Sequence, residues 1–352
     1  MRLLIFDTIF PIGHKSLNTR LLSYIESFAS VTVVNRRGYI ESETSVATTD
    51  FVYPSMVDIA GKGRLHSQLV LLRNFLSALA SVNLKNYDAI IFFTFDTLNF
   101  AIELPLLKRK PVYLIHHRNT AELQNRTKAK VFKTYCNKVH HIVFAQFIAD
   151  YLINDMGVRP ELVHVLPHPI LLQAGEPTDG IVKSGNKIFI AIAYSNDEGL
   201  IDKIVAYEEK TQLLLRNNIK LVMRWNREPY SNKSIEIIQG HLSEADYSRL
   251  YRDAMGVVLP YPQWYKNRFS GAIMDSIFLK KPVIGSDIAI FREFENQYSA
   301  FCSHFSSVED LFDRLISVES LDRVAVEKDY NKFLENHSNE IICKTLKQIV
   351  VL

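Results

Sequence analysis

The chain has 352 residues, of which 47% are apolar and 22% are charged, and its formal net charge at neutral pH is +3. This length suggests two domains, and the composition is that of an ordinary globular protein, which excludes a disordered chain and a fibrous repeat. The three cysteines, Cys136, Cys302 and Cys343, lie far apart and form no CxxC pair. Neither a disulfide framework nor a zinc finger is therefore predicted, and a reducing compartment is favoured.

The N-terminal segment MRLLIFDTIFPIGHK predicts a first β-strand rather than a targeting or membrane segment. Its apolar run is too short to cross a bilayer, and Asp7 interrupts it. It also lacks the basic start and the small-residue cleavage site of a signal peptide. We therefore expect a cytoplasmic protein.

Charge is distributed unevenly, since residues 1–176 carry a net charge of +5 and the remainder carries −2. Segment 108–138 has one acidic residue, Glu122, and nine basic ones: Lys108, Arg109, Lys110, Arg118, Arg126, Lys128, Lys130, Lys133 and Lys138. Two interpretations stay open, a solvated basic helix and a face that binds an anionic partner such as a membrane surface. No nucleic-acid recognition motif accompanies these residues, so nucleic acid is not an expected partner.

Short apolar runs alternate with longer segments of helical period, which is typical of parallel α/β proteins. In the first half we predict strands at 2–6, 31–35, 89–94, 112–115, 141–144 and 162–165, and helices at 18–30 and 64–82. In the second half we predict strands at 187–192, 220–224, 235–238, 256–259 and 282–284, helices near 198–216, 243–253 and 269–279, and a helical tail over 320–350.

The alternation is interrupted by a polar stretch rich in Gly and Pro, which predicts a linker over 171–186. We therefore expect an N-terminal lobe over 1–170, a C-terminal lobe over 187–325, and a helix over 326–352 that returns to the N-terminal lobe. The predicted fold class is α/β, with two Rossmann-like doubly wound lobes facing a central cleft. Ligands of such sheets bind outside the carboxyl ends of the strands.

The most informative segment is 235–294. A predicted buried strand ends at Pro260, and the polar, aromatic loop 261–268 then leads into a helix that begins near Ser270 and Gly271. Free N–H groups at a helix start can bind phosphate or sugar hydroxyls, and a glycine allows close approach. Asp275 lies one turn further along the same face, and its carboxylate suits a ribose diol.

This segment resembles the C-terminal lobe of the GT-B glycosyltransferases, especially the retaining family 4. The residues that match in kind are Gly240, Tyr251, Ala254, Pro260, Phe269, Pro282, Val283 and Ile284. Asn267 and Asp275 have the spacing of the family's Glu-x7-Glu motif, with Asn and Asp in place of the two glutamates. The resemblance implies a GT-B fold, a nucleotide-sugar donor held at its ribose by Asp275, and no bound metal ion or other cofactor.

The sequence departs from the family's donor-site pattern in the diphosphate grip as well as in the Glu-x7-Glu motif. The family's Gly-Arg and Lys-Gly grip on the donor diphosphate is absent, and residues 193–199 read AYSNDEG instead. Arg224, Lys266 and Arg268 are the candidates for the missing positive charge. The neutral Asn267 stands where the family has a glutamate, so its role among the catalytic candidates is left open.

The N-terminal lobe contributes two further candidate groups. Gly13, His14 and Lys15 follow the first strand, where the family has a glycine loop, and with Arg118 they are candidates for acceptor binding. His116 and His117 follow the strand at 112–115, where the family often has a histidine near the donor sugar. One of them can hydrogen-bond the sugar or act as a general base in an inverting enzyme, or the pair can be capping or solvent-facing residues. Metal binding is disfavoured because adjacent side chains point apart.

The expected function is a glycosyltransferase that moves a sugar from a nucleotide-sugar donor to a saccharide or lipid-linked saccharide acceptor. Bacterial surface polysaccharide synthesis, at the inner face of the cytoplasmic membrane, is the expected setting. Two other interpretations stay open: a noncatalytic or degenerate two-lobed subunit that binds sugar nucleotides, and a sugar-nucleotide epimerase.

Overall fold

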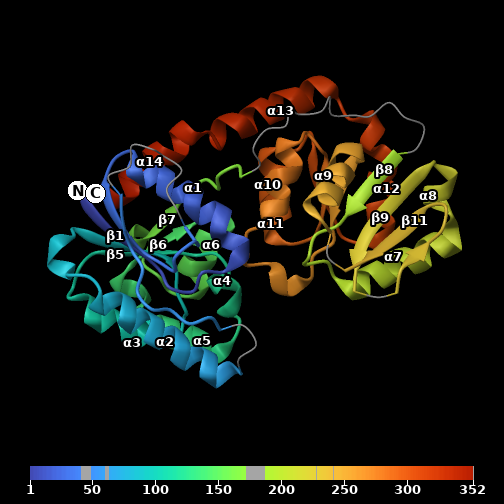
Figure 1. Cartoon of the computed structure of the whole chain (residues 1–352). Coiled ribbons are helices and arrows are strands. Elements are labelled where there is room, and N and C mark those ends of the chain that lie inside the picture. Colours follow the sequence, from blue (N-terminus) through green and yellow to red (C-terminus); the bar gives the residue numbers. More distant parts are fainter. Residues whose placement is uncertain (41–48, 60–62, 172–186, 227, 241, 352) are drawn as a thin grey trace. The chain divides into compact units, whose positions relative to one another are not determined.

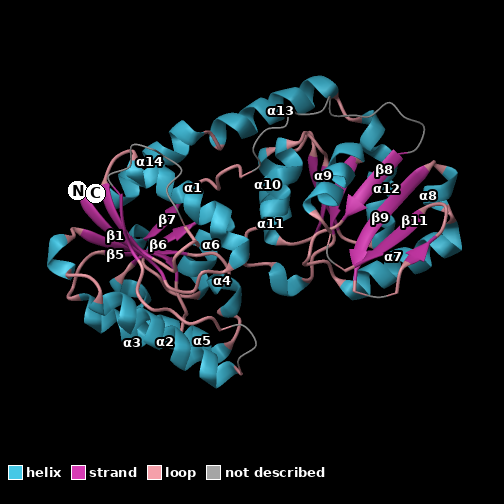
Figure 2. Ribbon diagram, in the orientation of Figure 1, coloured by secondary structure: helices cyan, strands magenta, loops and turns pink. Residues whose placement is uncertain are grey.

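The computed structural model describes residues 1–40, 49–59, 63–171, 187–226, 228–240 and 242–351. The chain divides into two compact units. Unit 1 contains Met1–Leu171 and His337–Leu352, and unit 2 contains Leu172–Asn336. Each unit is built on one seven-stranded sheet with helices on both faces (Figures 1 and 2). Apart from Leu171, the predicted linker lies outside the described residues.

The sheet of unit 1 is parallel throughout, in the order β3-β2-β1-β4-β5-β6-β7. Its first strand therefore lies in the middle, and the direction of winding reverses between β1 and β4. In doubly wound sheets this reversal is where ligands bind. The strands are β1 (Arg2–Asp7), β2 (Ser30–Val34), β3 (Thr49–Val52), β4 (Ala89–Thr94), β5 (Val112–Ile115), β6 (His140–Val143) and β7 (Val163–Val165).

Helices α1 (Lys15–Glu26) and α14 (Asn339–Val351) cover one face of this sheet, and α2 (Arg64–Ala80), α3 (Phe100–Glu103) and α5 (Arg126–Tyr135) cover the other (Figure 1). The Tyr24 hydroxyl donates to Asn339 Oδ1 over 2.6 Å and ties α14 to α1. The shorter helices are η1 (Ile12–His14), η2 (Leu84–Asn86), η3 (Leu104–Leu107), α4 (Asn119–Glu122), η4 (Cys136–Lys138), α6 (Gln146–Asp150), η5 (Tyr151–Asp155) and η6 (Pro160–Leu162).

The sheet of unit 2 has the order β10-β11-β9-β8-β12-β13-β14, and only β10 runs antiparallel to its neighbour. Here the winding reverses between β8 and β12. The strands are β8 (Lys187–Ala191), β9 (Ile219–Trp225), β10 (Tyr230–Ser231), β11 (Ile235–Gln239), β12 (Gly256–Leu259), β13 (Val283–Ser286) and β14 (Cys302–Phe305).

Helices α7 (Glu198–Thr211), α8 (Leu213–Arg216) and α12 (Val308–Ser317) pack on one face of this sheet around an apolar core that includes Phe189, Leu221 and Phe312. Helices α9 (Glu244–Asp253), α10 (Gly271–Phe278) and α11 (Ala289–Gln297) belong to the remainder of unit 2. Helix α13 (Arg323–Asn336) packs on α10, where the Tyr330 hydroxyl donates to the Phe278 carbonyl. The short helices η7 (Gln263–Tyr265) and η8 (Val318–Ser320) complete the unit.

The predicted strands are all present, and three of them, at 89–94, 112–115 and 256–259, have the predicted bounds. The prediction missed β3, β10 and β14, which are short strands at or near the sheet edges. It was wrong about the tail, which is two helices rather than one. Helix α13 ends at Asn336, and the ring of His337 hydrogen-bonds through Nδ1 to the backbone oxygen of His168. The chain therefore joins unit 1 at His337 and not at residue 326.

Candidate functional site

Three histidines gather at the carboxyl edge of the unit 1 sheet. His14 follows β1, His117 follows β5 and His168 follows β7. The rings of His14 and His117 stack with their centroids 4.3 Å apart, and Phe144 contacts the rings of both His117 and His168. Two of the predicted residues, distant in sequence, therefore lie side by side, next to the point where the winding of the sheet reverses.

His117 presents an acceptor atom to this edge. Its ring donates a hydrogen bond to the Phe93 carbonyl, whereas Nε2 is buried and has no hydrogen-bond partner among the described residues. Burial, together with the neighbouring His14 and His168, lowers the pKa of His117 well below 6.5. The imidazole is therefore neutral at physiological pH, and its Nε2 lone pair is available to a ligand hydroxyl.

His116 has a different environment, although it is adjacent in sequence. It is only 1% exposed, and its Nε2 lies 2.8 Å from His141 Nδ1. His141 Nε2 in turn lies 2.8 Å from the carbonyl oxygen of Cys136, which can only accept. His141 therefore donates to Cys136, and His116 donates to His141. Since His116 is part of this internal chain of hydrogen bonds, His117 is the better catalytic candidate of the two.

The predicted acceptor residues around this cluster are mostly at the surface. Gly13, Lys15 and Arg118 are exposed, and the Lys15 ammonium donates to the Gly38 carbonyl. A Cβ added at Gly13 would meet nothing within 4 Å, so the fold itself does not require glycine there. The exposed cations give this edge of unit 1 a positive rim.

Asp7, which the sequence analysis did not select, organises the loop that carries His14. The side chain is fully buried at the end of β1 and accepts hydrogen bonds from Thr94 Oγ1, Asn18 Nδ2 and the Phe10 backbone N–H. Burial raises the pKa of Asp7 to about 6. An aspartate at the end of an otherwise apolar strand was the available signal, because a buried carboxylate needs several donors.

Asp275 is the central residue of the predicted donor site in unit 2. It lies in the second turn of α10, and its carboxylate has no hydrogen bond or ion pair within the part of the chain that the structure describes. The residue keeps intermediate exposure, but the carboxylate is enclosed enough for burial to raise its pKa to about 7. Tyr247 and Tyr251 lie near enough for its charge to raise their own pKa values. An enclosed acid without a partner is costly unless a ligand supplies hydrogen bonds.

The start of α10 lies beyond the carboxyl end of β12, at the carboxyl edge of the unit 2 sheet. Ser270 is the residue before the helix, and its hydroxyl pairs with the Tyr261 hydroxyl at 2.9 Å rather than capping the helix. Gly271 is exposed, and a Cβ there would meet nothing within 4 Å. The first N–H groups of α10 therefore have no side-chain cap from Ser270 and can bind an anion.

The loop before α10 holds the remaining predicted donor residues. The Arg268 guanidinium lies over the rings of Tyr265 and Trp264, at 4.6 and 5.6 Å from their centroids. Lys266 is exposed and Asn267 is buried. The loop thus brings two cations to the residues just before α10, and their contact with a donor phosphate stays a prediction.

Arg224 is held in place by a ring contact and a hydrogen bond. Its guanidinium lies 3.5 Å from the centroid of the Tyr194 ring, and its Nε donates to the Gly240 carbonyl over 2.6 Å. Arg224 therefore fixes the loop after β11, and Tyr194, which the sequence analysis gave no role, covers it. Asn196 links the same loops, since its Nδ2 donates to the carbonyls of Ala191 and Arg224.

Two further observations concern metal ions and membranes. Within the described part of the chain, no three His, Cys, Asp or Glu side chains are arranged to hold a metal ion. Over the same residues, no helix has both the length and the apolar character needed to cross a bilayer.

No family model matches the sequence, and no curated protein is similar to it. Solved structures are similar over the whole chain. A sucrose-phosphate synthase from Thermosynechococcus elongatus gives a TM-score of 0.68 at 11% identity, over 99% of this chain and 98% of that one. The HepE protein of Anabaena, in complex with UDP-glucose, gives a TM-score of 0.65 at 12% identity, over 100% of both chains. The chain has the GT-B fold.

Another similar structure is a putative UDP-N-acetylglucosamine 2-epimerase from Listeria monocytogenes. Its TM-score is 0.56 at 12% identity, over 99% of this chain and 96% of that one. At these identities the similarity establishes the shared architecture, since one fold supports several activities.

Proposed function

We propose that this chain is a nucleotide-sugar glycosyltransferase that binds its donor at the carboxyl edge of the unit 2 sheet. The observation that carries this proposal is the enclosed Asp275 carboxylate, which lies one turn inside a helix whose first N–H groups face the same edge. Two adjacent hydroxyls of a ribose can donate to the two carboxylate oxygens. A sugar nucleotide has both the diol for Asp275 and the diphosphate for the helix start.

Positive charge around the helix start suits the donor diphosphate. The N–H groups that begin at Gly271 supply fixed donors, and Lys266 and Arg268 supply cations from the preceding loop. Arg224 adds a third cation from the end of β9. These groups would stabilise the charge that develops on the leaving nucleoside diphosphate, which is the role of the missing family grip. We propose that they do this without a metal ion and that Asn267 takes the place of the family's first glutamate.

His117 is the proposed catalytic residue of unit 1. Because its pKa lies well below 6.5, it is a weak base at physiological pH. This favours the role of a hydrogen-bond acceptor for a sugar hydroxyl over that of a general base. Stacking on His14 limits the rotation of the ring and keeps Nε2 in place. The exposed Lys15 and Arg118, with Gly13, would bind the acceptor, and their charge suits an acceptor that carries phosphate.

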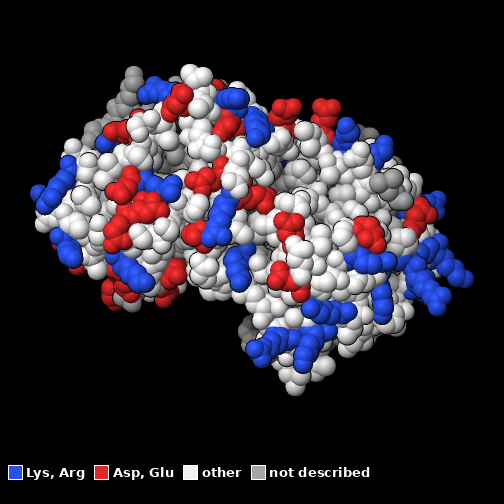
Figure 3. Space-filling model, turned by 180° about the vertical axis from the view of Figure 1, so that it is seen from behind, with Lys and Arg blue, Asp and Glu red and all other residues white. Residues whose placement is uncertain are grey.

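We also propose that the acceptor is a saccharide or lipid-linked saccharide of bacterial surface polysaccharide synthesis, and that the enzyme works at the inner face of the cytoplasmic membrane. An exposed apolar ridge on α2, α3 and η3 supports this setting, with Leu65 78% exposed, Leu69 61% and Ile102 57%. Leu76 and Leu106 extend the ridge. The exposed cations nearby are Arg73, Lys108 and Arg109. Figure 3 shows Lys and Arg side chains gathered on the lower right of the molecule as seen from behind. Apolar residues flanked by cations favour an anionic bilayer.

We expect the protein to sediment with vesicles of phosphatidylcholine and phosphatidylglycerol at low salt, and to bind less in 0.5 M salt. Replacing Leu65 and Leu69 by glutamine should weaken this binding about tenfold, because two exposed side chains lose their burial in the interface. Val324→Gln is the matched control, since Val324 is 79% exposed but lies in unit 2. If the native protein stays in the supernatant with anionic vesicles at low salt, the membrane setting is wrong.

The transferase activity is tested by incubating the protein with a panel of nucleotide sugars and measuring free nucleotide with and without acceptor extracts. We expect nucleotide release that depends on the acceptor. Formation of an epimer without nucleotide release would replace the proposal by an epimerase. Tight donor binding without either reaction would indicate a noncatalytic subunit, and no binding of any nucleotide sugar would contradict all three.

A further inference from the structure

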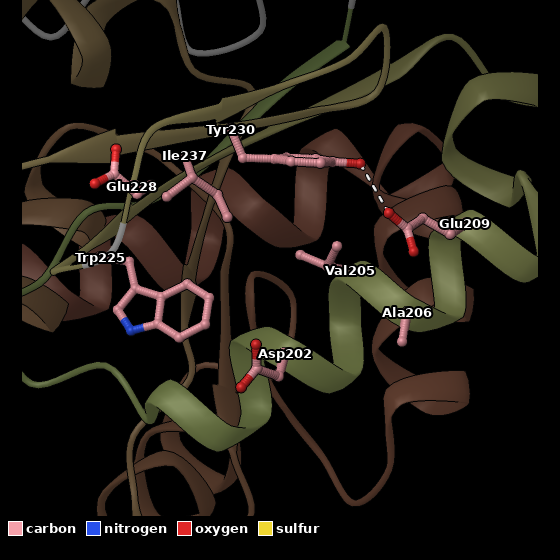
Figure 4. A pocket seen from close by; sticks show the side chains of 8 residues that line it. All are labelled: Asp202, Val205, Ala206, Glu209, Trp225, Glu228, Tyr230 and Ile237. Atoms are coloured by element: carbon pink, nitrogen blue, oxygen red, sulfur yellow. Dashed lines mark hydrogen bonds between the residues drawn. The ribbon is translucent and has the colours of Figure 1, made fainter.

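A pocket lies in unit 2, between helix α7 and the strands β9, β10 and β11 (Figure 4). Its volume is about 580 Å³, which is within the range of small-molecule sites. The residues that line it are Asp202, Val205, Ala206, Glu209, Trp225, Glu228, Tyr230 and Ile237. None of them belongs to the proposed donor or acceptor sites, so the pocket has a separate role.

The walls of the pocket are apolar and aromatic. Trp225 is 6% exposed and Ile237 is 5% exposed, so both are fixed parts of the unit 2 core. Val205 and Ala206 form the opposite wall on α7 (Figure 4). The Tyr230 hydroxyl donates to Glu209 Oε1 over 3.0 Å, which holds the tyrosine ring across one end.

The charge of the pocket has one sign. Three of its eight lining residues are the exposed acids Asp202, Glu209 and Glu228, and none of the eight is Lys or Arg. Asp202 and Glu209 are seven residues apart on α7, which places them roughly 10 Å apart along the helix axis. This separation is too large for the two acids to share one metal ion, whose ligands lie within about 2.6 Å of it.

We propose that this pocket binds a linear aliphatic polyamine. Such a molecule carries ammonium groups separated by methylene chains, and its terminal ammonium groups can pair with carboxylates about 10 Å apart along α7. The methylene chain then lies against Val205, Ala206 and Ile237. The faces of Trp225 and Tyr230 add cation–π attraction, which the acids alone would not provide. Anionic ligands are repelled by the three carboxylates, so the pocket does not compete for the nucleotide donor.

The experiment is a calorimetric titration of the full chain with spermidine at low and high salt. We expect saturable binding of one equivalent that weakens as salt rises, because the contacts are ionic. The double variant Asp202→Asn with Glu209→Gln should bind spermidine about tenfold more weakly. Asp313→Asn removes an exposed acid of the same unit outside the pocket and should leave the affinity unchanged.

Two further readouts keep the test specific. In a Trp264→Phe background, Trp225 is the only tryptophan, and its fluorescence should change on spermidine binding but not with magnesium ion alone. No spermidine binding by the folded native protein would overturn the proposal. If the Asp313→Asn control loses as much affinity for spermidine as the double variant, the binding is nonspecific and ionic, which would also overturn the proposal. Tighter binding of oligolysine than of spermidine would assign the pocket to a protein segment instead.

Discussion

Replacing Asp275 by asparagine is expected to weaken binding of a nucleotide-sugar donor by about 100-fold while making unit 2 more stable. The loss of affinity follows because hydrogen bonds to a charged acceptor contribute about 1.5–3 kcal/mol each, and the amide presents one acceptor atom where the carboxylate presents two. The gain in stability follows because the carboxylate has no partner among the described residues. A residue kept for function at a cost in stability gives this pair of effects.

The stability effect of Asp275 depends on pH. Its folded-state pKa of about 7 lies above the ordinary value of 3.8, so the folded protein holds this proton at pH values where the unfolded chain has lost it. Stability therefore falls as pH rises from about 4 to about 7, and above pH 7 the folded state carries the whole penalty of up to about 4 kcal/mol. The asparagine variant should be the more stable protein at pH 8 and similar to the native protein at pH 4.

Calorimetric titration with UDP-glucose measures the affinity, and urea unfolding followed by tryptophan fluorescence measures the stability of unit 2. Both tryptophans, Trp225 and Trp264, lie in that unit. Asp313→Asn serves as the control for both measurements. If Asp275→Asn leaves donor affinity unchanged, Asp275 does not hold the ribose. If the variant is destabilised at pH 8, the carboxylate is structural.

Acidification is expected to unfold unit 1 before unit 2. Burial lowers the pKa of His141 and His337 to about 4 and that of His168 to about 3, from an ordinary value of 6.5. The unfolded chain therefore binds these protons first, and stability is lost as pH falls below 6.5. At pH 4 the three histidines lower the free energy of unfolding of unit 1 by roughly 9 kcal/mol. His116 and His117, whose pKa values are also lowered, add to this loss.

Two buried acids of unit 1 oppose this loss. Burial raises the pKa of Asp7 to about 6 and that of Glu103 to about 8, so the folded state gains protons as pH falls. Together the two acids raise the free energy of unfolding of unit 1 by roughly 5 kcal/mol as the pH falls from 7 to 4. The five histidines lower the free energy of unfolding by more than the two acids raise it. The net loss is comparable to the whole free energy of unfolding of an ordinary domain, about 5–15 kcal/mol.

The two units can be followed separately. Far-ultraviolet circular dichroism should report the loss of unit 1 while tryptophan fluorescence, which reports unit 2, is unchanged. His337→Asn keeps a donor for the His168 carbonyl and removes one titrating group. It should therefore lower the midpoint pH of the acid unfolding of unit 1 by about half a pH unit. The exposed His66→Asn should leave the midpoint unchanged. Coincident transitions by both probes would contradict this account.

The sequence predicted the fold well because its signals are local and periodic. Apolar runs such as 89–94 and 256–259 are buried on both faces of parallel sheets, and they correspond to strands residue for residue. The edge strands β3 and β14 contain polar residues and lacked this signal.

The sites were only partly predictable, because they depend on contacts between residues far apart in sequence. The sequence indicated Asp275 and the start of α10 from spacing alone. It could not separate His116 from His117, which have different ring partners, His141 for the first and His14 for the second. Nor could it show that Tyr194 covers Arg224, or that Asp7 meets Asn18 and Thr94.

We propose that this chain transfers a sugar from a nucleotide donor bound at Asp275 to an acceptor bound near His117. The most direct measurement is the transfer of isotopically labelled sugar from a panel of nucleotide sugars into bacterial lipid and polysaccharide extracts. We expect the native protein to label one acceptor fraction with one donor, and Asp275→Asn and His117→Ala both to lose this transfer while remaining folded. Label transfer that survives both substitutions, or donor binding by the native protein without transfer to any fraction, would contradict it.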